Sequence, residues 1–261
     1  MDKKQFSMIL QKWSLVFKIL PVLVFIIVLK IIAHYFGFEV ITLNALYTSL
    51  VAGTIFLMGF LISGVLTDYK ESEKIPSELS ASIESLYDEA YTAHKGKNSK
   101  AALKFIEYQR LFIHSLIDWF WKKERTGAIL EKVRGMNDVF VDMEREGVQA
   151  NYIIKMKNEQ SNIRKIILRA HAIRDTEFIA SAYAIVEALA FFLTLGLILI
   201  KVEPFYESLF FTTLVTFLVT YMIVLIQDLD NPFDYSANGE SGTEISLKPL
   251  QELEASLEKA K

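Results

Sequence analysis

The stretch AGTIFLMGFLISGVLTDYKESEK, residues 52–74, changes from an apolar run to a charged one within one helical turn. Its apolar part begins at about Leu43, ends at about Leu66 and contains no charged side chain. A helix needs roughly 20 apolar residues to cross the hydrocarbon core of a membrane. The sequence therefore predicts a membrane-spanning helix that leads into a polar part of the chain.

Three further segments are long and apolar enough to cross the same core. They run from about Leu15 to Tyr35, over 178–200 and over 205–226. The composition agrees, because 52% hydrophobic residues and a mean hydropathy of +0.30 are typical of helical membrane proteins. Lys18 and Lys30 lie near the ends of the first segment, where long side chains can reach water.

Residues between the second and third segments show apolar side chains at three- and four-residue spacing, which predicts helices throughout. One such stripe is Ile129, Val133, Met136, Phe140 and Met143. We predict an all-α fold in which a long helical cytosolic insert separates two pairs of membrane helices. The expected divisions are 1–66 (N-terminal segment and first pair), 67–177 (insert), 178–227 (second pair) and 228–261 (acidic turn and tail).

Basic residues flank the predicted membrane helices on one side. The short turns offer only Lys201, whereas the other side carries Lys3, Lys4, Lys12, Arg169 and Arg174. Because positive charge favours the cytoplasmic side, we expect a multi-pass protein of the cell membrane with both termini in the cytoplasm.

Composition and motifs argue against an enzyme. The chain has no cysteine, its four histidines are scattered, and it has no phosphate-binding loop or nucleophile motif. A net charge of −3 gives no sign of a nucleic-acid partner. We expect no enzymatic activity and no cofactor.

Glu187 is the exceptional polar residue of the membrane segments, about midway along the third. An ionised carboxylate there is costly unless it is paired, protonated or hydrated. It either lies beside an ion path or proton relay, or is a protonated carboxyl bonded to a neighbouring helix. The candidate partners are Thr212, Thr213, Thr216 and Thr220.

The second membrane segment carries a stripe that repeats every four residues: Ala52, Phe56, Phe60 and Gly64. Gly53 and Gly59 would allow a neighbouring helix to approach closely. On a single helix, such a stripe faces lipid or the protein core. In a symmetric ring of helices it would form an aromatic constriction around an axis.

The segment from Phe56 to Phe60, followed by Thr67, is similar to the Phe-x-x-Gly-Phe pore-helix stretch of bestrophins. Asn231, Pro232 and Phe233 resemble the Asn-Pro-Phe-Gly-Glu-Asp element that follows the last membrane helix in that family. The order of two helices, a helical insert and two helices is also similar. Bacterial bestrophin-like proteins of unknown function are a closer match.

Bestrophins are pentameric ion channels, so the resemblance implies a homopentameric barrel in the lipid bilayer that conducts small inorganic ions. It implies Phe56 and Phe60 as neck residues, with Ala52 or Gly64 completing the stripe. The family favours small anions such as chloride. Rings of Asp68 and Glu71 at the pore mouth would instead favour cations.

The resemblance also raises calcium binding at Asp228, Asp230 and Asp234, since the acidic element binds calcium in animal members. This chain lacks the glycine and the acidic run, so the alternative is a turn that redirects the tail onto the insert helices. Two other functions remain open: a non-conducting scaffold or sensor whose insert binds a protein, and a monovalent cation channel or proton-coupled transporter that uses Glu187.

Overall fold

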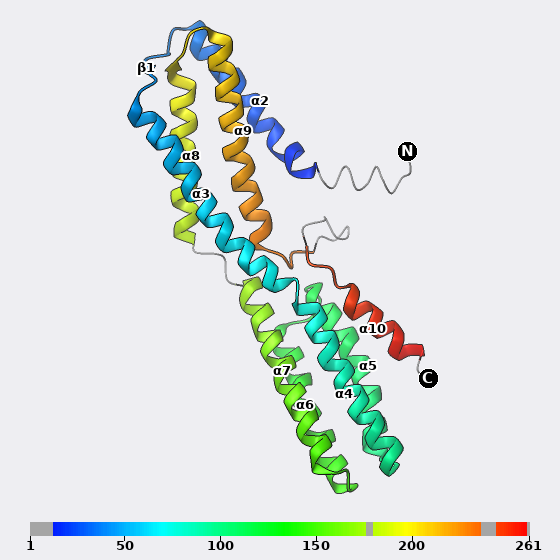
Figure 1. Ribbon diagram of the computed structural model, residues 1–261. Helices are drawn as coiled ribbons and strands as arrows, with labels where there is room; N and C mark the ends of the chain where they lie inside the picture. Colours follow the sequence, from blue (N-terminus) through cyan, green and yellow to red (C-terminus); the bar gives the residue numbers. More distant parts are fainter. Residues whose placement is uncertain (1–12, 176–179, 236–243, 260–261) are drawn as a thin grey trace. The chain divides into compact units, whose positions relative to one another are not determined.

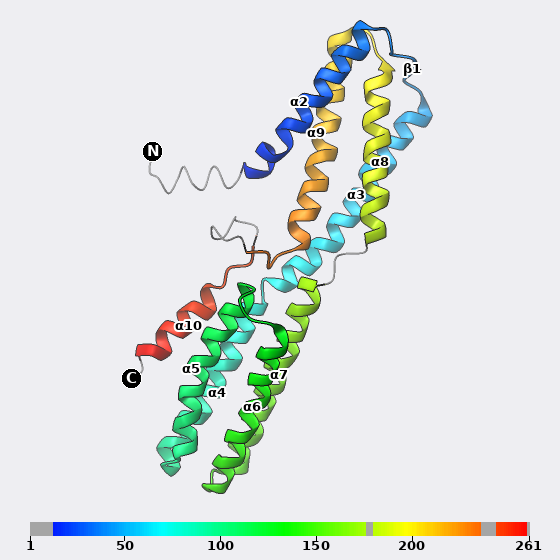
Figure 2. The same ribbon diagram turned by 180° about the vertical axis from the view of Figure 1, so that it is seen from behind.

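The computed structural model of the chain describes residues 13–175, 180–235 and 244–259. These residues form two compact units, whose helices Figures 1 and 2 show from opposite sides. The membrane unit comprises residues 13–69 and 180–231, and the insert unit comprises 70–175, 232–235 and 244–259. The division into four segments expected from the sequence stays a prediction.

The membrane unit contains the predicted apolar helices, which are α2 (Ser14–Tyr35), α3 (Ala45–Ser72), α8 (Ala180–Leu199) and α9 (Phe205–Asp230). Among the described residues, four helices are long and apolar enough to cross a membrane, and these elements supply them. The end of α9 agrees with the sequence, because Asn231 before Pro232 disfavours a further helical turn. The protein is a multi-pass, mostly helical membrane protein.

The core of the membrane unit joins α3 to the second pair of helices. Met58, Leu61 and Val65 of α3 are buried in one apolar cluster with Val186 and Leu193 of α8. Helices α2, α8 and α9 also pack against one another. Many large apolar side chains on these helices nevertheless remain exposed in the single chain, which leaves them available to lipid or to other copies.

A two-residue parallel bridge joins the two helix pairs at one end of the membrane unit (Figure 1). Strand β1 (Ile41–Thr42) follows α2, and strand β2 (Ile200–Lys201) follows α8. Ile41 lies opposite Ile200 in the register. The bridge therefore fixes the loop after α2 to the loop after α8.

The insert unit is a bundle of α4 (Ile75–Lys97), α5 (Lys100–Phe120), α6 (Thr126–Arg145) and α7 (Ala150–Asp175). Helix α4 packs on α5 and α7, and α6 packs on the same two helices. The predicted stripe of α6 is confirmed, since all of its members are buried. The regular spacing of apolar residues in the sequence therefore identified correctly the face of α6 that packs into the core of the bundle.

The C-terminal tail folds onto this bundle. Helix α10 (Lys248–Lys259) packs on α4 and α5, and its buried side chains are Leu250, Leu253 and Leu257. Phe233 is also buried, with its ring centroid 5.4 Å from that of Phe120 at the end of α5. The Ile245 amide donates a hydrogen bond to the Pro232 carbonyl at 2.9 Å. These contacts anchor both ends of the tail in the insert unit.

Candidate functional site

Helix α3 presents the predicted stripe on an exposed face. Phe56 and Phe60 keep 77% and 69% of their accessible surface, Ala52 is exposed and Gly64 is half-buried. The opposite face is buried and is formed by Thr54, Met58, Leu61 and Val65. The two phenylalanines are thus available to line a pore, although that role stays a prediction.

The two glycines beside the stripe face open space rather than a neighbouring helix of the described residues. A Cβ added at Gly53 or Gly59 would meet no atom within 4 Å outside its own helical surroundings. The close helix packing expected at these glycines stays a prediction.

The two acidic residues of the predicted pore mouth lie on the last turns of α3. Asp68 is exposed. Glu71 forms an ion pair with Arg169 of α7 inside the insert unit. A ring of Glu71 side chains would therefore carry a matching ring of Arg169 cations, which weakens the argument for cation selectivity.

Glu187 is exposed on α8. Its side chain has no hydrogen bond or ion pair with any described residue. Two of the expected threonine partners donate elsewhere: Thr212 to the Leu197 carbonyl at 3.4 Å, and Thr213 to the Leu209 carbonyl at 2.7 Å. Among the described residues, Glu187 makes no bond to α9 within the single chain, and both interpretations of this residue stay predictions.

Two of the three aspartates around the Asn-Pro-Phe element have lysine partners within their own units. Asp228 pairs with Lys18 at 3.3 Å, and Asp234 pairs with Lys122 at 2.5 Å. No cluster of three histidine, aspartate or glutamate side chains suited to a metal occurs in the described parts of the chain. Calcium binding at these aspartates stays a prediction.

A charged cluster that the sequence did not predict lies where α2 ends. The Lys30 side chain is fully buried, with its Nζ 2.6 Å from Glu39 Oε1 and 2.6 Å from the Ile200 carbonyl. His34 Nδ1 lies 2.8 Å from Glu39 Oε2, and its ring stacks on Phe205. Lys30 does not reach water as expected, because Glu39 folds back from the loop and supplies the counter-charge.

Glu39 is held as a carboxylate by this cluster. Burial raises the pKa of the Glu39 carboxyl, but the hydrogen bonds and positive charges of His34 and Lys30 outweigh it and lower the pKa below the ordinary glutamate value. The signal available in the sequence was an acidic residue in a short turn, nine positions after a lysine within an apolar run.

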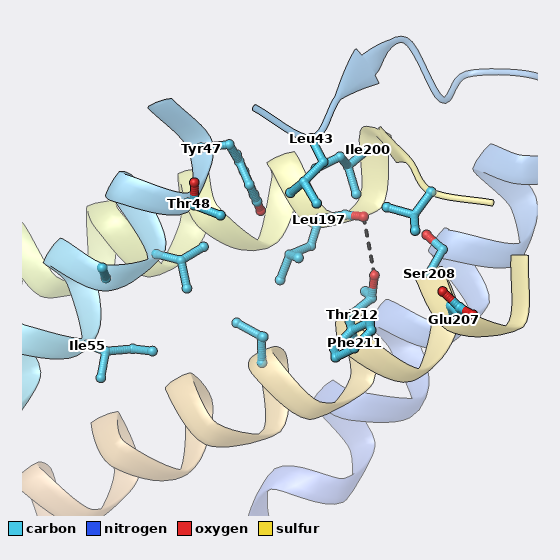
Figure 3. A pocket seen from close by; sticks show the side chains of 14 residues that line it. Leu43, Tyr47, Thr48, Ile55, Leu197, Ile200, Glu207, Ser208, Phe211 and Thr212 are labelled. Atoms are coloured by element: carbon cyan, nitrogen blue, oxygen red, sulfur yellow. Dashed lines mark hydrogen bonds between the residues drawn. The ribbon is translucent and has the colours of Figure 1, made fainter. Parts of the chain in front are cut away.

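A pocket of about 600 Å³ opens in the membrane unit between α3, α8 and α9 (Figure 3). Its lining is mostly apolar and includes Val51, Ile55, Leu197, Phe211 and Val215. Ala52 of the exposed stripe also lines it, so the pocket lies beside the candidate pore-lining face.

The fold is similar to that of several solved structures. Three crystal structures of a bacterial bestrophin homolog from Klebsiella pneumoniae, each with a different single substitution, match with TM-scores of 0.78, 0.76 and 0.74. Sequence identity is 14–16%, and the matches cover 93–94% of this chain and 97–98% of the homolog. The chain has the bestrophin fold.

The bestrophin fold accounts for nearly the whole chain, and it agrees with the order of elements expected from the Phe-x-x-Gly-Phe and Asn-Pro-Phe stretches. No protein-family model matches the sequence, and no curated protein matches it. Identity this low shows the bestrophin fold and does not transfer the role of any single side chain.

Proposed function

We propose that the protein is a passive ion channel, a homopentamer in the cell membrane with both termini in the cytoplasm. The neck is formed by α3, with Phe56 and Phe60 facing the axis. The observation that carries this proposal is the exposure of both rings on a helix whose opposite face is buried in its own unit. The bestrophin fold supports it, since the family resemblance implies an α3-lined neck.

Three features of the membrane unit support assembly from several copies. The apolar faces of its helices are largely exposed. Gly53 and Gly59 leave room for a helix that the single chain does not supply. Glu187 lacks a partner among the described residues and is costly against lipid tails. A neighbouring copy, or water enclosed by a ring of copies, would satisfy all three.

The proposed selectivity is for small anions such as chloride. The edge of a phenylalanine ring carries partial positive charge, so rings that present their edges to the axis tolerate an anion while removing part of its hydration. The pairing of Glu71 with Arg169 supports the same preference, because it offsets one of the two carboxylates at the proposed mouth.

The test is ion flux from liposomes that contain the purified protein, together with the mass of the complex in detergent. We expect a pentamer that releases chloride faster than sodium. The Phe56→Ala, Phe60→Ala double variant should raise the flux or change its ion preference. The matched control is Phe191→Ala, Phe192→Ala on α8, which removes two rings of similar exposure outside the proposed neck.

Unchanged conductance and ion preference in the double variant would overturn the assignment of the neck. A monomer without flux would overturn the channel and would leave the scaffold or sensor as the better function.

A further inference from the structure

The pocket beside α3 has two unpaired oxygen-bearing side chains at one end. Figure 3 shows Glu207 and Ser208, which are neighbours in the first turns of α9, together at that end. Ser208 keeps 2% of its accessible surface, and its Oγ has no hydrogen-bond partner. Glu207 is exposed and its carboxylate is bonded to no described residue. A buried unpaired hydroxyl is costly, which indicates a missing partner.

The other hydroxyls that line the pocket are all satisfied by the backbone. Tyr47 donates to the Leu193 carbonyl at 2.8 Å, and Thr212 donates to the Leu197 carbonyl at 3.4 Å. Thr48 donates to the Asn44 carbonyl at 3.0 Å. The side-chain oxygens of the pocket that lack a hydrogen-bond partner therefore lie only at the end with Glu207 and Ser208.

The charge of that end is negative. Among the described residues, no lysine, arginine or histidine lines the pocket. The nearby Lys201 is paired with Glu203 at 3.0 Å, and neither of these two residues lines it. A ligand that satisfies Glu207 must supply a positive charge, and one that also satisfies Ser208 must bring hydrogen-bond donors. A protonated amine supplies both.

The rest of the pocket suits an apolar body. Its volume of about 600 Å³ lies within the roughly 300–1,000 Å³ of small-molecule sites. Most of its side chains come from three membrane helices, so a ligand that partitions into the bilayer can reach them.

We propose that this pocket binds an amphipathic ammonium ion. The ammonium group donates to the Glu207 carboxylate and to Ser208 Oγ, and the hydrocarbon chain extends between Ile55 and Val215. A lipid acyl chain alone would fill the apolar part and leave both oxygens unpaired. An amphipathic anion would place its charge against Glu207. This inference does not depend on ion conduction.

The experiment is equilibrium dialysis of the purified complex in detergent micelles against radiolabelled octylamine, octanol or octanoate at pH 7, with protein-free micelles subtracted. Octylamine is protonated at this pH, because primary amines titrate near the lysine value of about 10.4. We expect saturable binding of one octylamine per chain, at least about tenfold tighter than octanol, as a hydrogen-bonded charge pair gives. Octanoate should bind no better than octanol.

Glu207→Gln should reduce the affinity for octylamine to that for octanol, and Ser208→Ala should reduce it by a smaller factor. Glu203→Gln is the matched control, because it removes a carboxylate four residues before Glu207 that does not line the pocket. Val215→Trp should abolish saturable binding of both octylamine and octanol by filling the apolar part.

Equal affinity for octylamine and octanol in the unaltered protein would overturn the proposal and would indicate a site for hydrocarbon chains only. Tight binding of octanoate, or no saturable binding of octylamine, would also overturn it. These comparisons need no variant, so the proposal remains testable even if Glu207→Gln does not fold.

Discussion

Lys30 and Glu39 form an ion pair at 2.6 Å in which the lysine side chain has no contact with solvent. Its Nζ also donates to the Ile200 carbonyl in β2. One lysine thus connects α2, the loop before β1 and the strand that follows α8. The buried Lys30 ammonium stabilises the fold only while its partners are present, because an unpaired buried charge is strongly unfavourable.

We expect Lys30→Met to destabilise the membrane unit by about 3 kcal/mol, because it leaves Glu39 without its buried cation. The measurement is thermal unfolding in one detergent. Lys18→Met is the control, since it breaks an ion pair whose lysine side chain is 59% exposed, and it should cost less than about 1 kcal/mol. An equal loss of stability in the two variants would show that the burial of Lys30 does not contribute to the stability of the membrane unit.

The lowered pKa of Glu39 predicts a dependence of stability on pH. The folded-state pKa lies below the unfolded-state pKa, so the ionised carboxylate stabilises the fold above the ordinary glutamate pKa. That contribution is lost as the pH falls through the folded-state pKa. We expect the stability advantage of the unaltered protein over Glu39→Gln to be constant near neutral pH and to shrink in acid. Melting both proteins from pH 7 to pH 3 tests this, and a constant difference would contradict it.

Gly196→Ala should destabilise the membrane unit by about 1–3 kcal/mol, because the new methyl group would lie 2.5 Å from Cε2 of Tyr47. The Tyr47 hydroxyl is bonded to the Leu193 carbonyl, so the ring has little freedom to move away. In a Tyr47→Leu background, the same substitution should cost much less. Gly96→Ala on α4, whose Cβ would meet no atom of the described residues within 4 Å outside its own helix, is the control in thermal unfolding.

Phe233→Ala should loosen the tail from the insert unit at a cost of about 3 kcal/mol, since a buried ring against Phe120 is lost. Limited proteolysis should then cut the chain between 235 and 245 faster than in the unaltered protein. Asp234→Asn alters the adjacent residue but breaks only a surface ion pair, so it should leave the cutting rate unchanged. Equal rates for all three proteins would show that Phe233 does not anchor the tail.

Arg169→Gln should shift the ion preference toward cations if the protein conducts, because it frees the Glu71 carboxylate at the proposed pore mouth. Reversal potentials in unequal chloride solutions measure the shift. Arg164→Gln is the control, since Arg164 is exposed on the same helix and makes no ion pair with a described residue. An identical effect of both substitutions would point to net charge alone.

The membrane spans and the insert helices could be predicted from the sequence, because each depends on a local pattern. An apolar run of sufficient length or a strong helical period needs no knowledge of distant residues, and the buried stripe from Ile129 to Met143 is an example. The end of α9 followed in the same way from Pro232.

The buried charge cluster and the close approach of Tyr47 to Gly196 depend instead on distant parts of the chain. Lys30 in an apolar run fits either a side chain that reaches water or a buried ion pair, and the position of Glu39 decides between them. The candidate pore depends on other molecules as well, because the proposed partners of Phe56 and Phe60 belong to other copies of the chain. The four-residue spacing identified the stripe, but it could not show whether several copies of α3 assemble around an axis.

The anchoring of the tail also offers a place to label the protein. The Tyr235 hydroxyl donates to the Ile245 carbonyl at 2.6 Å, and the Ile245 amide donates to the Pro232 carbonyl, so residues 235 and 245 are held close together. Lengthening the chain between two points that are already held together costs only about 0.6 kcal/mol for each doubling of the intervening length. A fluorescent domain inserted between 235 and 245 would therefore report on the protein in living membranes while both chain ends stay unmodified.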